Sequence, residues 1–143
     1  MPEREIKSFR FELESTDEDG TFSGYAAVFG NIDSGNDVIE RGAFADTIKD
    51  NFDRIKILSQ HNDCDLPIGK PIELREDEKG LYLKAKISDT NKGRDILTLM
   101  RDGVLNELSI GYDPVDFDVD AVANIRRLRK VNLWEISVVT WAM

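Results

Sequence analysis

The stretch Gly80-Leu-Tyr-Leu-Lys-Ala-Lys-Ile87 decides the fold, because its apolar and polar side chains alternate. This alternation predicts a half-buried β-strand whose apolar side chains face a core. The residues expected to face that core are Leu81, Leu83, Ala85 and Ile87. The turn signal Glu78-Lys-Gly80 precedes the strand.

Strand-like segments continue on both sides of this stretch. They are Glu5 to Glu14, Thr21 to Phe29, Arg54 to Ser59 and Val131 to Thr140. Turn residues at Asp17 to Gly20 predict that the first two of these segments form a hairpin. Sheet strands therefore dominate the chain.

Two short helices are expected among the strands. Phe44, Ile48 and Phe52 recur at a spacing of four, which is typical of an amphipathic helix. A second helix begins at Thr90 or Asp89 as the N-cap and buries Ile96, Leu97 and Met100, with Asp102-Gly103 as its stop. We find no internal repeat and no interdomain linker. The sequence thus predicts a mainly β or α+β fold in one domain over residues 1–143, an antiparallel β-barrel or rolled sheet flanked by short helices.

Composition excludes several classes of function. The 143 residues contain 19 Lys and Arg against 28 Asp and Glu, a net charge of −9, which disfavours binding to nucleic acid. With one cysteine and one histidine, the chain cannot form an intrachain disulfide and lacks the usual ligands of a zinc site, so we expect neither a metal nor another cofactor. No apolar run approaches the ~20 residues that span a bilayer, so we expect no membrane interaction. We expect the protein to be cytosolic.

His61 is the first candidate for catalysis, because an imidazole is the side chain that exchanges protons most readily near neutral pH. It follows the strand that ends at Ser59, in the segment Gln60-His-Asn-Asp63. The alternative is an exposed turn residue without a role. Cys64 is a rival nucleophile, but its acidic neighbours Asp63 and Asp65 disfavour a thiolate.

Ser109 is the second candidate. In Leu108-Ser-Ile-Gly-Tyr112 it shares a strand face with Gly111, which predicts open space above the hydroxyl. The alternative is a strand serine that faces water. The segment is not the Gly-x-Ser-x-Gly elbow of other hydrolases, because the preceding glycine is missing.

Glu135 is the third candidate. In Trp134-Glu-Ile-Ser-Val-Val139 it has the same parity as Val131, Leu133 and Val139, which predicts a carboxylate on an apolar face. Such a carboxylate needs a partner. Two roles stay open: a structural ion pair with Arg126, Arg127 or Arg129, and orientation of an imidazolium in a Ser-His-acid arrangement.

These pieces, in this order, resemble the tailed-bacteriophage prohead protease family, capsid-maturation serine proteases related to the herpesvirus assembly proteases. The blocks that carry the resemblance are Gly24-Tyr-Ala-Ala-Val-Phe29, Asp33 with Asp37-Val-Ile, Gly42-Ala-Phe44, His61 with Pro67-Ile-Gly69, Leu108-Ser-Ile-Gly-Tyr112 and Leu133-Trp-Glu-Ile-Ser-Val-Val-Thr140. The resemblance implies an antiparallel barrel flanked by helices, like that of the herpesvirus proteases. The expected domain is a single prohead protease domain over residues 1–143, its C-terminal tail absent or removed.

The resemblance also implies a function. The implied function is that of a serine endopeptidase, which cleaves scaffold and capsid-protein segments, and itself, inside the immature procapsid in the cytoplasm of the bacterial host. Ser109 is then the nucleophile, His61 the general base and Glu135 the third member, with Asp63 and Asp65 as alternatives for the third role. By a looser analogy with the arginine pair of the herpesvirus enzymes, Arg126 and Arg127 are candidates for the oxyanion hole. The alternative, which we favour, is that both are solvated arginines on a strand.

The implied partners are the major capsid protein and scaffold as peptide substrates, and a second copy of the chain in a homo-oligomer such as a dimer. Two other functions are weighed against the endopeptidase. One is a catalytically inactive barrel that serves as a structural or scaffolding module of capsid assembly. The other is a hydrolase of non-peptide esters. Contact between His61 and Ser109 separates the catalytic hypotheses from the structural one.

Overall fold

The computed structural model describes residues 5–10, 15–16, 19–33 and 35–141. The strands are β1 (Glu5–Arg10), β2 (Ser15–Thr16), β3 (Thr21–Val28), β4 (Asp37–Ile39), β5 (Lys56–Ser59), β6 (Gly69–Glu76), β7 (Gly80–Ile87), β8 (Glu107–Asp120) and β9 (Ile125–Val139). The helices are α1 (Ala45–Asn51), a 3₁₀ turn η1 (Phe52–Arg54) and α2 (Asn91–Arg101).

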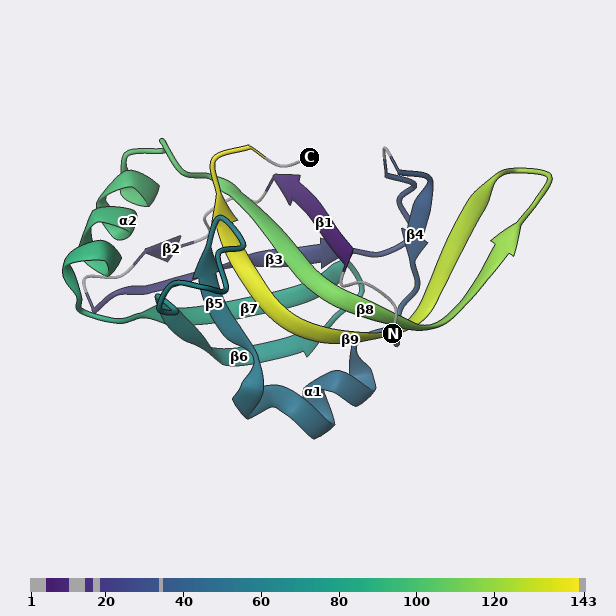
Figure 1. Ribbon diagram of the computed structural model, residues 1–143, viewed down its shortest axis with the longest axis horizontal. Coiled ribbons are helices and arrows are strands. Elements are labelled where there is room, and N and C mark those ends of the chain that lie inside the picture. The colour runs from purple at the N-terminus through teal and green to yellow at the C-terminus, as the bar shows by residue number, and fades with distance from the viewer. Residues whose placement is uncertain (1–4, 11–14, 17–18, 34, 142–143) are drawn as a thin grey trace.

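Within the described ranges these strands form a single curled sheet, a half-barrel with α1 and α2 beside it (Figure 1). Its order is β1-β8-β9-β5-β6-β7-β3-β2, with β4 beside β9. Most pairs are antiparallel, as predicted, but β4 and β5 both run parallel to β9. The predicted fold class is confirmed.

Two details of strand pairing differ from the sequence prediction. The expected hairpin is wrong for β1, which pairs with β8, while the short β2 pairs with β3. Residues 11–14 of the first expected strand lie outside the described residues. β8 and β9 form a long hairpin whose tip projects from the body of the sheet (Figure 1).

The core lies inside the curl of the sheet. The four apolar residues predicted from β7 are all buried, at 0–1% exposure, because alternate residues of a strand point to the same side. Other strands contribute in the same way, and Tyr112, Phe22 and Phe44 are the largest fully buried side chains. The buried side chains of these strands therefore belong to one apolar core.

Both predicted helices are present. Thr90 caps α2, since its side chain accepts a hydrogen bond from the backbone N–H of Gly93, and Ile96, Leu97 and Met100 are buried. The single helix expected over Phe44, Ile48 and Phe52 corresponds to α1, which the 3₁₀ turn η1 follows at Phe52. In the described part of the chain, no helix is long and apolar enough to cross a membrane.

Candidate active site

Strand β8 carries Ser109 in the interior of the sheet. It lies between β1 and β9 and directly opposite Ser137 of β9. Its neighbours Leu108 and Ile110 belong to the core, so the Ser109 side chain lies on the other face. Ser109 has 0% exposure. The predicted open space above Ser109 is therefore wrong, because other side chains of the site fill it.

The Glu135 carboxylate occupies the space beside Gly111. The two residues are opposite each other on β8 and β9, and a Cβ on residue 111 would lie 2.4 Å from Oε1 of Glu135. A glycine in a strand often marks such a close approach. Glu135 is 5% exposed. The glycine thus permits a buried carboxylate to lie against the backbone of β8.

A β-bulge at Trp134 decides which way Glu135 points. Gly111 pairs with Glu135, but the next residue, Tyr112, pairs with Leu133, so β9 contains one extra residue. Opposed residues share a face, so Glu135 lies on the opposite face from Leu133. The sequence prediction that these two residues share a face is wrong, and the bulge is the reason.

His61 reaches this face from a tight turn after β5. Gln60 and His61 both have positive φ (56° and 55°), and the N–H of Asn62 donates to the carbonyl of Ser59, as in a type I′ turn. Non-glycine residues in this region cost about 1–3 kcal/mol each, so other contacts must hold them. The N–H of Gln60 donates to the carbonyl of Val138, and the N–H of His61 donates to Ser137 Oγ.

Three side chains meet in a row at this point. Nε2 of His61 lies 2.5 Å from Oγ of Ser109, and Nδ1 of His61 is hydrogen-bonded to Oε1 of Glu135. The imidazole is 17% exposed, whereas the Glu135 side chain is 6% exposed. The ring is therefore the part of the row that solvent reaches.

This row can transfer a proton. With Nδ1–H donating to the carboxylate, Nε2 is free to accept the proton of the Ser109 hydroxyl. The carboxylate fixes the orientation of the ring and stabilises the imidazolium that forms. A buried hydroxyl, an imidazole and an acid in this order define a candidate serine hydrolase.

Two of the alternative partners of Glu135 and His61, Arg129 and Asp65, are paired with other residues. Arg129 pairs with Asp116 and Asp118. Lys92 binds Asp65, and this hydrogen bond holds the pKa of the carboxyl below its usual value.

Cys64, the rival nucleophile of the sequence analysis, is exposed beside Asp63. Its Sγ lies 3.6 Å from Oδ1 of Asp63. The thiol therefore has an acidic group as its neighbour.

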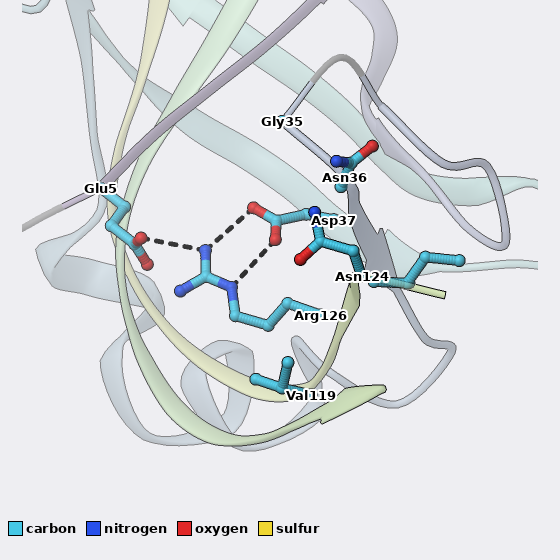
Figure 2. A pocket seen from close by; sticks show the side chains of 8 residues that line it. Glu5, Gly35, Asn36, Asp37, Val119, Asn124 and Arg126 are labelled. Carbon is cyan, nitrogen blue, oxygen red and sulfur yellow. Dashed lines mark hydrogen bonds and ion pairs between the residues drawn. The ribbon is translucent and has the colours of Figure 1, made fainter. Parts of the chain in front are cut away.

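Arg126 lies in a separate pocket of about 370 Å³, shown in Figure 2. Its guanidinium donates two hydrogen bonds to Asp37 and one to Glu5, each 2.9 Å long. The hydrogen bonds that Arg126 donates to Asp37, followed by the one it donates to Glu5, raise the pKa of Arg126 above its usual value. The guanidinium is committed to these carboxylates, so the analogy with an oxyanion-hole arginine has no geometric support for Arg126.

Sequence reasoning missed Ser137. Its Oγ donates to Oε2 of Glu135 at 2.7 Å and accepts from the N–H of His61 at 3.1 Å. The signal was present, because residues two apart on a strand share a face and Ser137 follows Glu135 at that spacing.

Among the described residues, no cluster of three or more His, Cys, Asp and Glu side chains could hold a metal ion.

Comparison with known proteins shows the family to which the chain belongs. A sequence model of the caudovirus prohead serine protease family matches residues 9–142, and the chain belongs to this family. It is 34% identical over 124 residues to the prohead protease of Enterobacteria phage HK97, covering 85% of this chain and 55% of that protein. It is 31% identical over 109 residues to the prohead protease of Escherichia phage T5, covering 76% of this chain and 51% of that protein. The chain thus spans about half the length of the curated relatives it matches.

A solved structure shares the fold. The capsid assembly protease of bacteriophage T4 superimposes with a TM-score of 0.72 over 98% of each chain, at 10% sequence identity. At that identity the similarity supports the fold alone. The likeness to herpesvirus proteases stays a prediction.

Proposed function

We propose that the chain is a serine endopeptidase that cleaves scaffold and capsid-protein segments, and itself, during maturation of a phage prohead. Ser109 is the nucleophile, His61 the general base and Glu135 the residue that orients the imidazole. The contact of His61 with both other side chains is the observation that carries this proposal. Membership of the prohead serine protease family supports it.

The first chemical step forms the acyl-enzyme. As Oγ of Ser109 attacks the peptide carbonyl, its proton passes to Nε2 of His61, and a tetrahedral oxyanion forms. His61 then gives the proton to the leaving nitrogen as the carbon–nitrogen bond breaks. The amine product leaves, and an ester to Ser109 remains.

The second step regenerates the serine. A water molecule attacks the ester carbon while His61 takes one of its protons, and that proton returns to Oγ of Ser109 as the acid product leaves. Preorganised hydrogen-bond donors to the oxyanion typically lower such barriers by about 3 kcal/mol. Glu135 stabilises the imidazolium in both steps, and its burial strengthens that interaction.

The substrates and the location belong to the same proposal. The major capsid protein and scaffold are the substrates, and cleavage takes place inside the immature procapsid in the host cytoplasm. The chain is expected to self-associate as a homo-oligomer such as a dimer. Size-exclusion chromatography with light scattering checks the last point.

The nucleophile is tested with an activity-based fluorophosphonate, which labels an activated serine by losing fluoride as the oxygen–phosphorus bond forms. We expect the wild-type protein to gain one label on the tryptic peptide that contains Ser109. Ser109→Ala should gain none, while Ser23→Ala, which alters another buried serine on a different strand, should label like the wild type. Labelling that survives Ser109→Ala would reject this nucleophile.

Cleavage is tested by co-expression with the major capsid protein and scaffold of the same phage. Mass spectrometry should find shortened capsid protein with wild-type enzyme and full-length protein with Ser109→Ala. A labelled enzyme that leaves the capsid protein and scaffold intact but hydrolyses p-nitrophenyl esters would favour the ester hydrolase. A folded protein that neither labels nor cleaves would favour the structural module.

A further inference from the structure

Ser137 joins two parts of the site that are far apart in the sequence. Its hydroxyl donates to Oε2 of Glu135 at 2.7 Å, on the carboxylate oxygen that His61 does not use. Oγ of Ser137 also accepts a hydrogen bond from the backbone N–H of His61 at 3.1 Å. Ser137 is 0% exposed, so both bonds are shielded from bulk water. One side chain therefore holds both the acid and the turn that carries the base.

The chemistry of this position favours a hydroxyl. A serine hydroxyl has one proton to donate and lone pairs to accept, and here both capacities are used. An apolar side chain would leave a buried carboxylate oxygen and a buried N–H without partners, which is unfavourable for both groups. A carboxylate would repel Glu135. The position thus requires a small group that donates and accepts at once.

The backbone of His61 adds a second reason. Gln60 and His61 have positive φ angles, a backbone conformation that is unfavourable for residues other than glycine and needs support from surrounding contacts. The bond to Ser137 Oγ is the one that fixes the N–H of the catalytic residue itself. Ser137 cannot be a second nucleophile in this arrangement, because its proton is directed at Glu135 and not at the imidazole.

We propose that Ser137 is a positioning residue, which sets the rate of acyl transfer by fixing Glu135 and the His61 turn in one geometry. This inference rests on the proposed function, since it assumes that His61 activates Ser109. In this role Ser137 acts through the Glu135 carboxylate and the backbone of His61, and not through a bond to the substrate. Its removal should therefore slow the chemical step without weakening the binding of a substrate.

Ser137→Ala tests the proposal, with fluorophosphonate labelling resolved into a binding constant and a maximal rate. We expect the maximal rate to fall about 10- to 100-fold, the range expected when catalytic groups are misplaced by about 1 Å, with the binding constant unchanged. Ser137→Thr retains the hydroxyl and should recover most of the rate. Ser137→Cys, with its weak S–H donor and close to serine in size, should lie between Ala and wild type. Ser23→Ala is the matched control, a buried strand serine outside the site.

A structural readout separates this proposal from the proposed function. Amide hydrogen exchange at His61 should accelerate at least about 10-fold in Ser137→Ala and stay unchanged in Ser23→Ala, because only the former loses the acceptor of that N–H. Wild-type protein that fails to label at Ser109 would contradict the proposed function, and the exchange result would still test the anchoring. Normal labelling by Ser137→Ala, or unchanged exchange at His61, would overturn the role of Ser137.

Discussion

Gly111 and Glu135 face each other across β8 and β9, and a methyl group on residue 111 would lie 2.4 Å from Oε1 of the carboxylate. The three atoms nearest to such a methyl group all belong to the Glu135 side chain and none to the backbone, so we expect Gly111→Ala to fold with the carboxylate displaced. Displacement by about 1 Å should slow fluorophosphonate labelling about 100-fold. Gly35→Ala is the control, because its nearest neighbour would be 3.5 Å away in an exposed loop. A wild-type labelling rate in Gly111→Ala would contradict the packing argument.

Glu135→Gln separates charge from shape at the acid. The amide fills the same space but cannot stabilise an imidazolium and can leave His61 with its proton on the wrong nitrogen. We expect the turnover number for capsid-protein cleavage to fall about 10³- to 10⁴-fold, as in other Ser-His-acid sites. Glu73→Gln, which alters an exposed partner of Arg75, should retain full activity. Equal activity of the two variants would remove Glu135 from the mechanism.

Asp77 should make stability depend on acid pH. The Tyr25 hydroxyl donates to its carboxylate at 2.5 Å, the N–H groups of Lys79 and Gly80 donate as well, and these bonds hold the pKa of Asp77 below its ordinary 3.8. Because the folded-state pKa is the lower one, the stabilisation is complete above the unfolded-state pKa and is lost as pH falls through the folded-state pKa.

The comparison of wild type with Asp77→Asn measures this effect through urea midpoints between about pH 7 and pH 2. The advantage of the wild type should be constant near neutrality and shrink on the acid side of 3.8. Tyr25→Phe removes the largest cause of the shift and should weaken the pH dependence in the same range. An advantage that stays constant at every pH would show that the carboxylate is not stabilised in this way.

Phe44→Ala should destabilise the fold, because it removes a large side chain from the apolar core. Phe44 is 0% exposed, and its ring centroid lies 6.4 Å from that of Phe29. Removing a buried phenylalanine side chain typically costs about 3–5 kcal/mol of unfolding free energy, which urea denaturation measures. Leu66→Ala, at a residue that is 80% exposed, should change stability by less than about 0.5 kcal/mol. Equal effects of the two changes would mean that Phe44 is not part of the core.

Local patterns in the sequence predicted most of the elements. The alternation in β7 and the cap of α2 depend on neighbours close in the chain, so they can be recognised without knowledge of the fold. The same is true of the strand end before His61. Strand pairing is different. β1 pairs with β8, whose residues are about a hundred positions away in the sequence, and no local pattern encodes that pairing.

The site shows the same division. Ser109, His61 and Glu135 stood out by residue type, but the reason given for Glu135 assumed an uninterrupted strand. The bulge at Trp134 depends on how β9 pairs with β8, so it could not be seen in β9 alone. Ser137 was overlooked because a serine in a strand carries no signal until its neighbours across the sheet are known.

The extra residue at Trp134 reverses the side-chain direction of the β9 residues that follow it, Glu135 to Val139, relative to an uninterrupted strand. Without this extra residue, the carboxylate of residue 135 would point into the apolar core, and Ile136 would point to the opposite face of the sheet. Sequences of relatives should thus be aligned by side-chain direction and not by residue count, and a relative that lacks the insertion should carry its acid one position away.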